Sequence, residues 1–104
     1  MKTIFIASAE LVKEAKVYFK GEVVVRWVKD KFIAHQRFCP HQNADLNAAL
    51  VSDDLRLQCP MHPIKFCMES GKSNVQKWAI KVYETLVENN QLFIKINDNE
   101  TIVV

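Results

Sequence analysis

Two cysteine–histidine pairs near the middle of the chain are the residues best suited to metal chemistry. His41 follows Cys39 two positions later, and His62 follows Cys59 three positions later. Together these side chains offer two thiolates and two imidazoles, a ligand set that suits zinc or an iron–sulfur cluster with mixed sulfur and nitrogen ligands. Both spacings are too short for ligands presented from one face of a helix, so we expect each pair to lie on a loop.

The mixed composition of each pair favours an iron–sulfur cluster over zinc. A zinc finger usually pairs cysteine with cysteine and histidine with histidine, at Cys-x-x-Cys and His-x(3–5)-His spacings. Pro40 and Pro60 directly follow the two cysteines, and proline stiffens a loop because it fixes φ. Two alternatives stay open at this point. One is a zinc-binding structural module with Cys2His2 ligation, and the other is a chance alignment of four unrelated residues.

Short strands are predicted to position the two ligand loops. Alternating side chains over residues 32–38 predict a strand that leads into Cys39, and those over 55–59 predict a strand that leads into Cys59. Asn89 and Asn90 suit a hairpin turn, because asparagine tolerates positive φ. Further strands are expected over residues 1–9, 17–19, 23–28, 80–87 and 92–96, with one or two helical turns within 8–16. The fold class predicted from this pattern is all-β.

The composition indicates one folded domain over residues 1–104. Hydrophobic residues make up 49% of the chain and charged residues 25%, which is ordinary for a globular protein. The two glycines exclude the glycine-rich phosphate loops of dinucleotide-binding and P-loop proteins. The formal net charge is +2 and the basic residues are scattered, so we expect no nucleic-acid partner.

We also expect no membrane contact and a cytoplasmic location. No apolar segment approaches the length of a membrane span. The first nine residues faintly mimic a secretion signal, but their apolar core is too short, and we interpret them as a strand. The cysteine count is odd, and two of the three have a better use than a disulfide.

The ligand loops and their flanks resemble those of Rieske-type 2Fe–2S ferredoxins, the small family that includes the ferredoxin component of ring-hydroxylating dioxygenase systems. The resemblance covers nearly the whole chain from about residue 17 onward, including a closing hairpin over 83–94. Its most specific part lies in residues 39–46, 57–66 and 69–72. It implies one cluster per chain, with Cys39 and Cys59 on one iron and His41 and His62 on the other. It also implies stacked antiparallel sheets, with a small cluster-binding subdomain (about residues 37–74) at one tip.

Several positions depart from the family pattern. Asn43 and Pro63 stand where glycine is usual, and asparagine, unlike proline, can adopt positive φ. High-potential relatives carry an extra cysteine in each loop and hydroxyls near the cluster, and the hydroxyl positions match Ile64 and Phe66 here. Hydrogen bonds to the cluster sulfurs raise the potential, so we expect this chain to lie toward the lower end of the Rieske range.

The resemblance implies an electron-transfer protein rather than an enzyme. We expect a monomer that takes one electron from a reductase and passes it to a terminal oxygenase or similar enzyme. The alternative with the same cluster is the small Rieske subunit of a reductase, such as nitrite reductase. His35 is interpreted as structural, although no partner is evident in the sequence, and Cys67 as a small, partly buried thiol.

Overall fold

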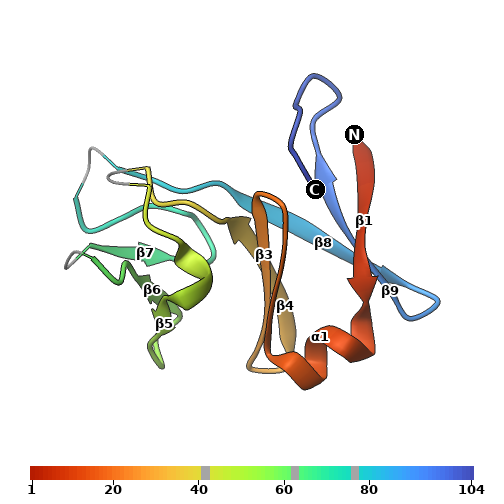
Figure 1. Ribbon diagram of the computed structural model, residues 1–104, viewed down its shortest axis with the longest axis horizontal. Helices are drawn as coiled ribbons and strands as arrows, with labels where there is room; N and C mark the ends of the chain where they lie inside the picture. The colour runs from red at the N-terminus through yellow and green to blue at the C-terminus, as the bar shows by residue number, and fades with distance from the viewer. Residues whose placement is uncertain (41–42, 62–63, 76–77) are drawn as a thin grey trace.

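Two antiparallel sheets of unequal size make up most of the computed structural model, which describes residues 1–40, 43–61, 64–75 and 78–104 (Figure 1). In the described part of the chain the larger sheet has six strands, in the order β1-β9-β8-β4-β3-β2. Their bounds are β1 Lys2–Ser8, β9 Gln91–Ile96, β8 Val82–Glu88, β4 Lys31–Gln36, β3 Val23–Val28 and β2 Val17–Lys20. The sheet curls, and Lys20 on β2 reaches the carbonyl of Phe5 on β1 (Nζ to O, 3.5 Å).

The smaller sheet contains β5 (Leu50–Val51), β6 (Arg56–Gln58) and β7 (Lys65–Cys67). A 3-10 helix, η1 (Leu46–Ala48), precedes it. Figure 1 shows the small sheet and η1 at one end of the molecule, away from β1 and β9. The all-β class predicted from the sequence is confirmed, as are the stacked antiparallel sheets; their unequal size is a finding of the structure.

Local sequence explains where several elements begin and end. The hydroxyl of Ser8 accepts a hydrogen bond from the backbone N–H of Leu11 (3.1 Å) and so caps α1 (Ala9–Ala15). Asn89 and Asn90 have φ of 51° and 61° between β8 and β9, as the hairpin prediction requires. No helix in the described ranges has the length and apolar character needed to cross a membrane.

The two predicted strands that lead into the cysteines are shorter in the structure than in the sequence-based prediction. The strand over 32–38 ends at Gln36, and Phe38 makes only an isolated bridge to Asp45. The prediction of a strand over 55–59 was wrong at Leu55, which has φ of 59° and closes the preceding turn. Its backbone N–H donates to the carbonyl of Ser52 (3.0 Å), so turn formation competes with strand pairing at this residue.

Two hydrophobic cores lie on the two faces of the large sheet. Side chains alternate along a strand, so Ala34 on β4 enters the first core while its neighbour Ile33 enters the second. The second core also takes side chains from the small sheet, among them Leu57 and Phe66. The small sheet therefore covers the second face of the large sheet, which explains why β3 is buried on both faces, as its β-branched run predicts.

Candidate metal centre

The two predicted cysteine ligands lie in the same hydrophobic core. Cys39 and Cys59 are each 1% exposed, and both belong to the second core, although they are far apart in sequence. The structure thus brings together the two described members of the predicted site. The predicted ligands His41 and His62 lie outside the described residues, and so does Pro63, so the complete ligand set stays a prediction.

The first ligand loop is closed at its base by backbone hydrogen bonds. The N–H of Cys39 donates to the carbonyl of Ala44 (2.8 Å), and the N–H of Asn43 donates to the carbonyl of Cys39 (2.7 Å). Asn43 has φ of 57°, in the left-handed region where asparagine is one of the few tolerated residues other than glycine. This confirms that asparagine meets the conformational requirement at a position where the family usually has glycine.

The second ligand loop has the same closure. The N–H of Cys59 donates to the carbonyl of Ile64 (3.0 Å), and the antiparallel pair Gln58–Lys65 continues the ladder into β6 and β7. Each loop therefore begins with a buried cysteine whose N–H bonds to the carbonyl five residues later. The first loop follows β4 of the large sheet, and the second joins β6 to β7 of the small sheet. Because the two cysteines share one core, the packing of the two sheets sets the separation of the loop bases, which a two-loop metal centre requires.

An ion pair between Arg37 and Asp45 joins the two ends of the first ligand loop. The guanidinium of Arg37 donates to both carboxylate oxygens of Asp45, at 3.1 and 2.9 Å. The hydrogen bond from Arg37 is the main reason why the pKa of the Asp45 carboxyl lies below its usual value. Asp45 also accepts from the N–H of Asn47 (2.9 Å) and so caps η1, while the Arg37 guanidinium stacks on the ring of Phe19 (3.9 Å). Sequence analysis did not identify this pair.

His35 is structural, as predicted, and the structure supplies its partner. It is fully buried, and its Nε2 accepts a hydrogen bond from Nε–H of Arg26 (3.1 Å). Its Nδ1 lies 2.7 Å from the carbonyl of Gln36, which makes Nδ1 the protonated nitrogen. Burial lowers the pKa of His35 to about 4, so the ring is neutral at pH 7. In the sequence, one feature indicated that Arg26 is unusual: it is a charged residue within a strand that was expected to be covered on both faces.

Cys67 is a half-buried thiol, as predicted from the sequence. It lies on β7 next to Phe66, and side chains of adjacent strand residues point to opposite faces. Phe66 belongs to the second core, so Cys67 faces away from that core. A hydrogen bond with the Ser70 hydroxyl, followed by backbone N–H groups, lowers the pKa of Cys67. We therefore separate this thiol from the two predicted ligands.

The surroundings of the two cysteines suit a cluster with thiolate ligands. The second core is built from apolar side chains, including Ile64 and Phe66, which are buried at the positions where high-potential relatives carry hydroxyls. Such an apolar shell restricts water and supplies no hydroxyl donors from these two positions. Two buried thiols on paired loops, each followed closely by a histidine in the sequence, fit a mixed-ligand 2Fe–2S cluster.

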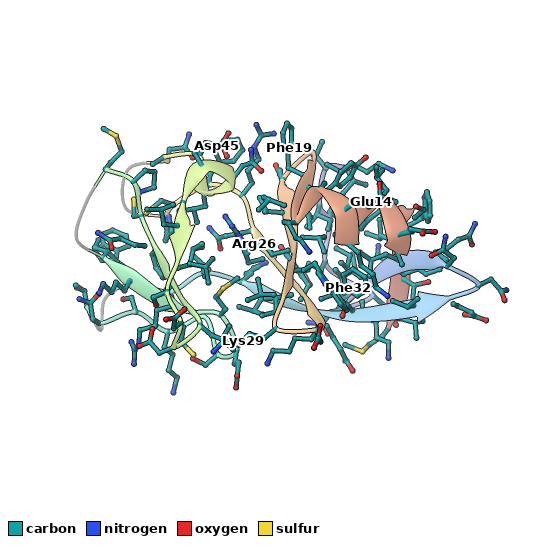
Figure 2. The ribbon with its side chains drawn as sticks, turned by 90° about the horizontal axis from the view of Figure 1, so that it is seen from below. Glu14, Phe19, Arg26, Lys29, Phe32 and Asp45 are labelled. Carbon is teal, nitrogen blue, oxygen red and sulfur yellow. The ribbon has the colours of Figure 1, made fainter. Side chains whose placement is uncertain are left out.

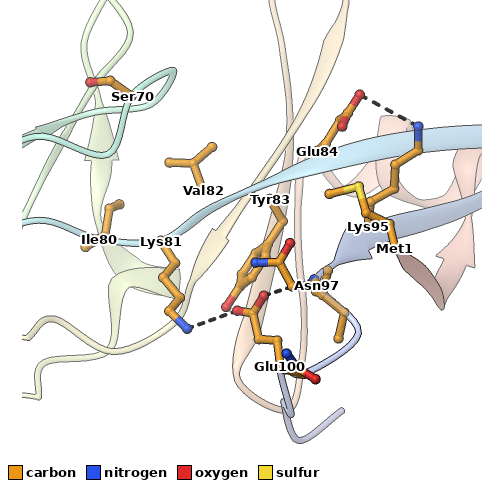
Figure 3. A pocket seen from close by; sticks show the side chains of 12 residues that line it. Met1, Ser70, Ile80, Lys81, Val82, Tyr83, Glu84, Lys95, Asn97 and Glu100 are labelled. Carbon is orange, nitrogen blue, oxygen red and sulfur yellow. Dashed lines mark hydrogen bonds and ion pairs between the residues drawn. The ribbon is translucent and has the colours of Figure 1, made fainter.

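A groove in the described structure lies elsewhere. It measures about 930 Å³ and is lined mainly by β8, β9 and the segment that follows β9 (Figure 3). An ion pair between Lys81 and Glu100 (2.9 Å) crosses it, and Ser70 lies at one side. Neither Cys39 nor Cys59 lines this groove, so it is separate from the candidate metal centre.

Residues 3–84 match the family described as the Rieske [2Fe-2S] domain. The 3-phenylpropionate/cinnamic acid dioxygenase ferredoxin subunit of Photorhabdus laumondii is 22% identical over 96% of this chain and 100% of that protein. Its namesake in Escherichia coli K12 is 30% identical over 66% of this chain and 67% of that protein.

Solved structures with the same fold include two kinds of small protein. The ferredoxin of carbazole 1,9a-dioxygenase from Nocardioides aromaticivorans IC177 has a TM-score of 0.79 at 19% identity, over 93% of this chain and 100% of that one. A putative nitrite reductase small subunit has a TM-score of 0.77 at 16% identity, over 92% and 100% of the two chains. The chain belongs to the Rieske [2Fe-2S] domain family, as its ligand loops predicted.

Proposed function

We propose that this protein is a one-electron carrier with a single Rieske-type 2Fe–2S cluster. Cys39 and Cys59 would bind one iron, and His41 and His62 the other. The observation that supports this most directly is the burial of both cysteines in one core, at equivalent positions of two loops with the same closure. The bound cluster supplies the one-electron redox chemistry, and the protein positions it and sets its surroundings.

The chain's own residues contribute three things to this role. Paired backbone at the base of each loop fixes the conformation of the chain around its cysteine. The apolar second core limits access of water to them. The ion pair of Arg37 with Asp45 anchors the exit of the first loop. In this proposal residues 37–74 serve as the cluster-binding subdomain of one domain over 1–104, and the protein acts in the cytoplasm, where thiols stay reduced.

The names of the relatives indicate the partners. Several are ferredoxin subunits of dioxygenases, and one solved structure of the same fold is a complex of a reduced oxygenase with an oxidised ferredoxin. We therefore propose that this chain accepts an electron from a reductase and delivers it to a terminal oxygenase. It would act as a monomeric carrier with no catalytic site of its own.

A second candidate keeps the cluster but changes the partner. The putative nitrite reductase small subunit has nearly the same structural similarity as the ferredoxins, so the fold does not separate the two roles. Copurification of a large reductase subunit with this chain would favour the second candidate. Transfer of electrons to an oxygenase by the isolated chain would favour the first.

The test of the cluster is an electron paramagnetic resonance spectrum of the dithionite-reduced protein, combined with three single substitutions. We expect the wild type to be red-brown and to show the low mean g value of nitrogen-ligated clusters. Cys39→Ser and Cys59→Ser should lose the signal, whereas Cys67→Ser, the matched control, should keep it. A colourless protein that contains zinc, or an all-cysteine spectrum, would contradict the proposal.

A further inference from the structure

Arg26 is a buried cation on the face of β3 that turns toward the small sheet. Arg26 is 4% exposed, while Val25, its neighbour on β3, belongs to the first core on the opposite face. Figure 2 shows Arg26 between the strands of the large sheet and the segment that contains η1. A charged group in such a place is costly unless its donors are satisfied.

Hydrogen bonds hold Nε and Nη2 of the guanidinium without neutralising its charge. The Nη2 group of Arg26 donates to the carbonyls of Leu46 (2.8 Å) and Ala49 (3.2 Å). Its Nε–H donates to Nε2 of the neutral His35 ring (3.1 Å). Over the described ranges, every acceptor recorded for Arg26 is uncharged, and it forms no ion pair. Burial lowers the pKa of Arg26 to about 10, so the side chain remains a cation at neutral pH.

Two of the acceptors of Arg26 belong to the core that contains the predicted cysteine ligands. Leu46 and Ala49 are buried members of the second core, the same core that contains Cys39 and Cys59. The segment that carries them begins directly after the first ligand loop. The structure therefore fixes an unneutralised positive charge against the core that surrounds the two cysteines.

We propose that the buried charge of Arg26 raises the reduction potential of the metal centre, with His35 and η1 holding that charge in place. This inference depends on the proposed function. In an oxidised 2Fe–2S centre, two thiolates balance the charge of the core, and the one electron received from the donor protein leaves a net negative charge. A buried cation that is bonded to the core around this charge and shielded from solvent stabilises the reduced form, because little water or salt screens the attraction.

The experiment compares the midpoint potentials of three substituted proteins with that of the wild type at pH 7. Arg26→Met removes the buried charge, and Arg26→Lys keeps it. Arg56→Met, the matched control, removes an arginine whose side chain is 45% exposed and pairs with Asp54 (3.2 Å). Iron and sulfide content is measured for each protein, so that only molecules with a cluster are compared.

We expect Arg26→Met to lower the equilibrium constant for reduction about tenfold, which is about 59 mV for one electron. Arg26→Lys and Arg56→Met should stay close to the wild-type potential. If Arg26→Met does not assemble a cluster, the midpoint potential of Arg26→Gln is compared with that of Arg26→Lys. This pair again contrasts a neutral with a charged side chain at position 26.

Two results would overturn the inference. One is a neutral substitution at position 26 with the wild-type potential. The other is a shift in Arg26→Lys as large as that in the neutral variant, which would indicate packing rather than charge. Failure of the proposed function is distinct, because it shows in the spectrum of the wild type before any variant is compared.

Discussion

Arg37 and Asp45 face each other across the base of the first ligand loop, with both carboxylate oxygens accepting hydrogen bonds from one guanidinium. The N–H of Leu46 also donates to the carbonyl of Arg37 (2.6 Å), so backbone and side chains close the loop together. Because Asp45 in addition caps η1, one carboxylate connects the loop that carries Cys39 to the segment that binds Arg26.

Replacing Asp45 should therefore destabilise the protein. We expect Asp45→Ala to lower the free energy of unfolding by about 1 kcal/mol, the usual effect of losing a helix cap, with a small further loss from the partly exposed ion pair. The measurement is urea unfolding followed by circular dichroism. Asp53→Ala is the matched control, because in the described structure no interaction of the Asp53 carboxylate is recorded. Equal losses in the two variants would contradict the role of Asp45.

The buried neutral state of His35 should make stability fall in mild acid. The pKa of His35 is about 4 in the folded protein and about 6.5 in the unfolded chain, so between these values the unfolded chain binds more protons. Stability from this residue is thus complete above about pH 6.5 and is lost as the pH falls toward 4. We expect a loss of about 2 kcal/mol between pH 7 and pH 5.

His35→Gln isolates this effect, because glutamine can accept from Arg26 and donate to the carbonyl of Gln36 but does not titrate. Unfolding of the wild type and the variant is measured at several values from pH 7 to pH 5. The wild type should lose more stability over this interval than His35→Gln does. Parallel profiles would mean that His35 does not stay neutral in the folded protein.

Much of the fold was predictable because it depends on local patterns. Alternation located β4, the pair Asn89–Asn90 located the turn between β8 and β9, and the Cys–His spacings of the two pairs indicated loops after Cys39 and Cys59. The short strands β5 and β7 were not predicted, because two or three residues are too few to show a period of two.

The contacts of Arg26 could not be predicted for a different reason. Its bond with His35 depends on the register of β3 against β4, where Val24 is opposite His35 and Arg26 is opposite Ile33. Its bonds to η1 join segments about twenty residues apart that only the packing of the second core brings together. Sequence analysis could show that a charge lay in a buried strand, but the partners that satisfy it follow from tertiary structure.

The conformation of Asn43 predicts which residues this loop position accepts. Its φ of 57° is strained for a β-branched side chain and free of strain for glycine. We expect Asn43→Gly to keep wild-type stability and Asn43→Val to lose about 1–2 kcal/mol, measured by thermal unfolding. Asn99→Val is the control, since Asn99 is exposed and is not among the positive-φ residues. A stable Asn43→Val protein would show that the loop does not need the left-handed conformation.

The apolar side chains near Cys59 predict a low reduction potential. Ile64 and Phe66 are buried in the second core, at positions where high-potential relatives carry hydroxyls that stabilise the reduced cluster. We expect a redox titration of the wild type to give a midpoint below about +100 mV, within a Rieske range of roughly −150 to +300 mV.

A hydroxyl added at position 66 should raise this potential, because a hydrogen bond to a cluster sulfur favours the more negative, reduced state. Phe66→Tyr adds the hydroxyl, and Phe93→Tyr is the matched control. Phe93 lies on β9, away from the small sheet, and packs edge-to-face against Phe5 (ring centroids 5.7 Å apart). The potential should rise in Phe66→Tyr and stay unchanged in Phe93→Tyr. A wild-type value well above +100 mV, or equal potentials in the two variants, would show that hydroxyls at this position do not control the potential.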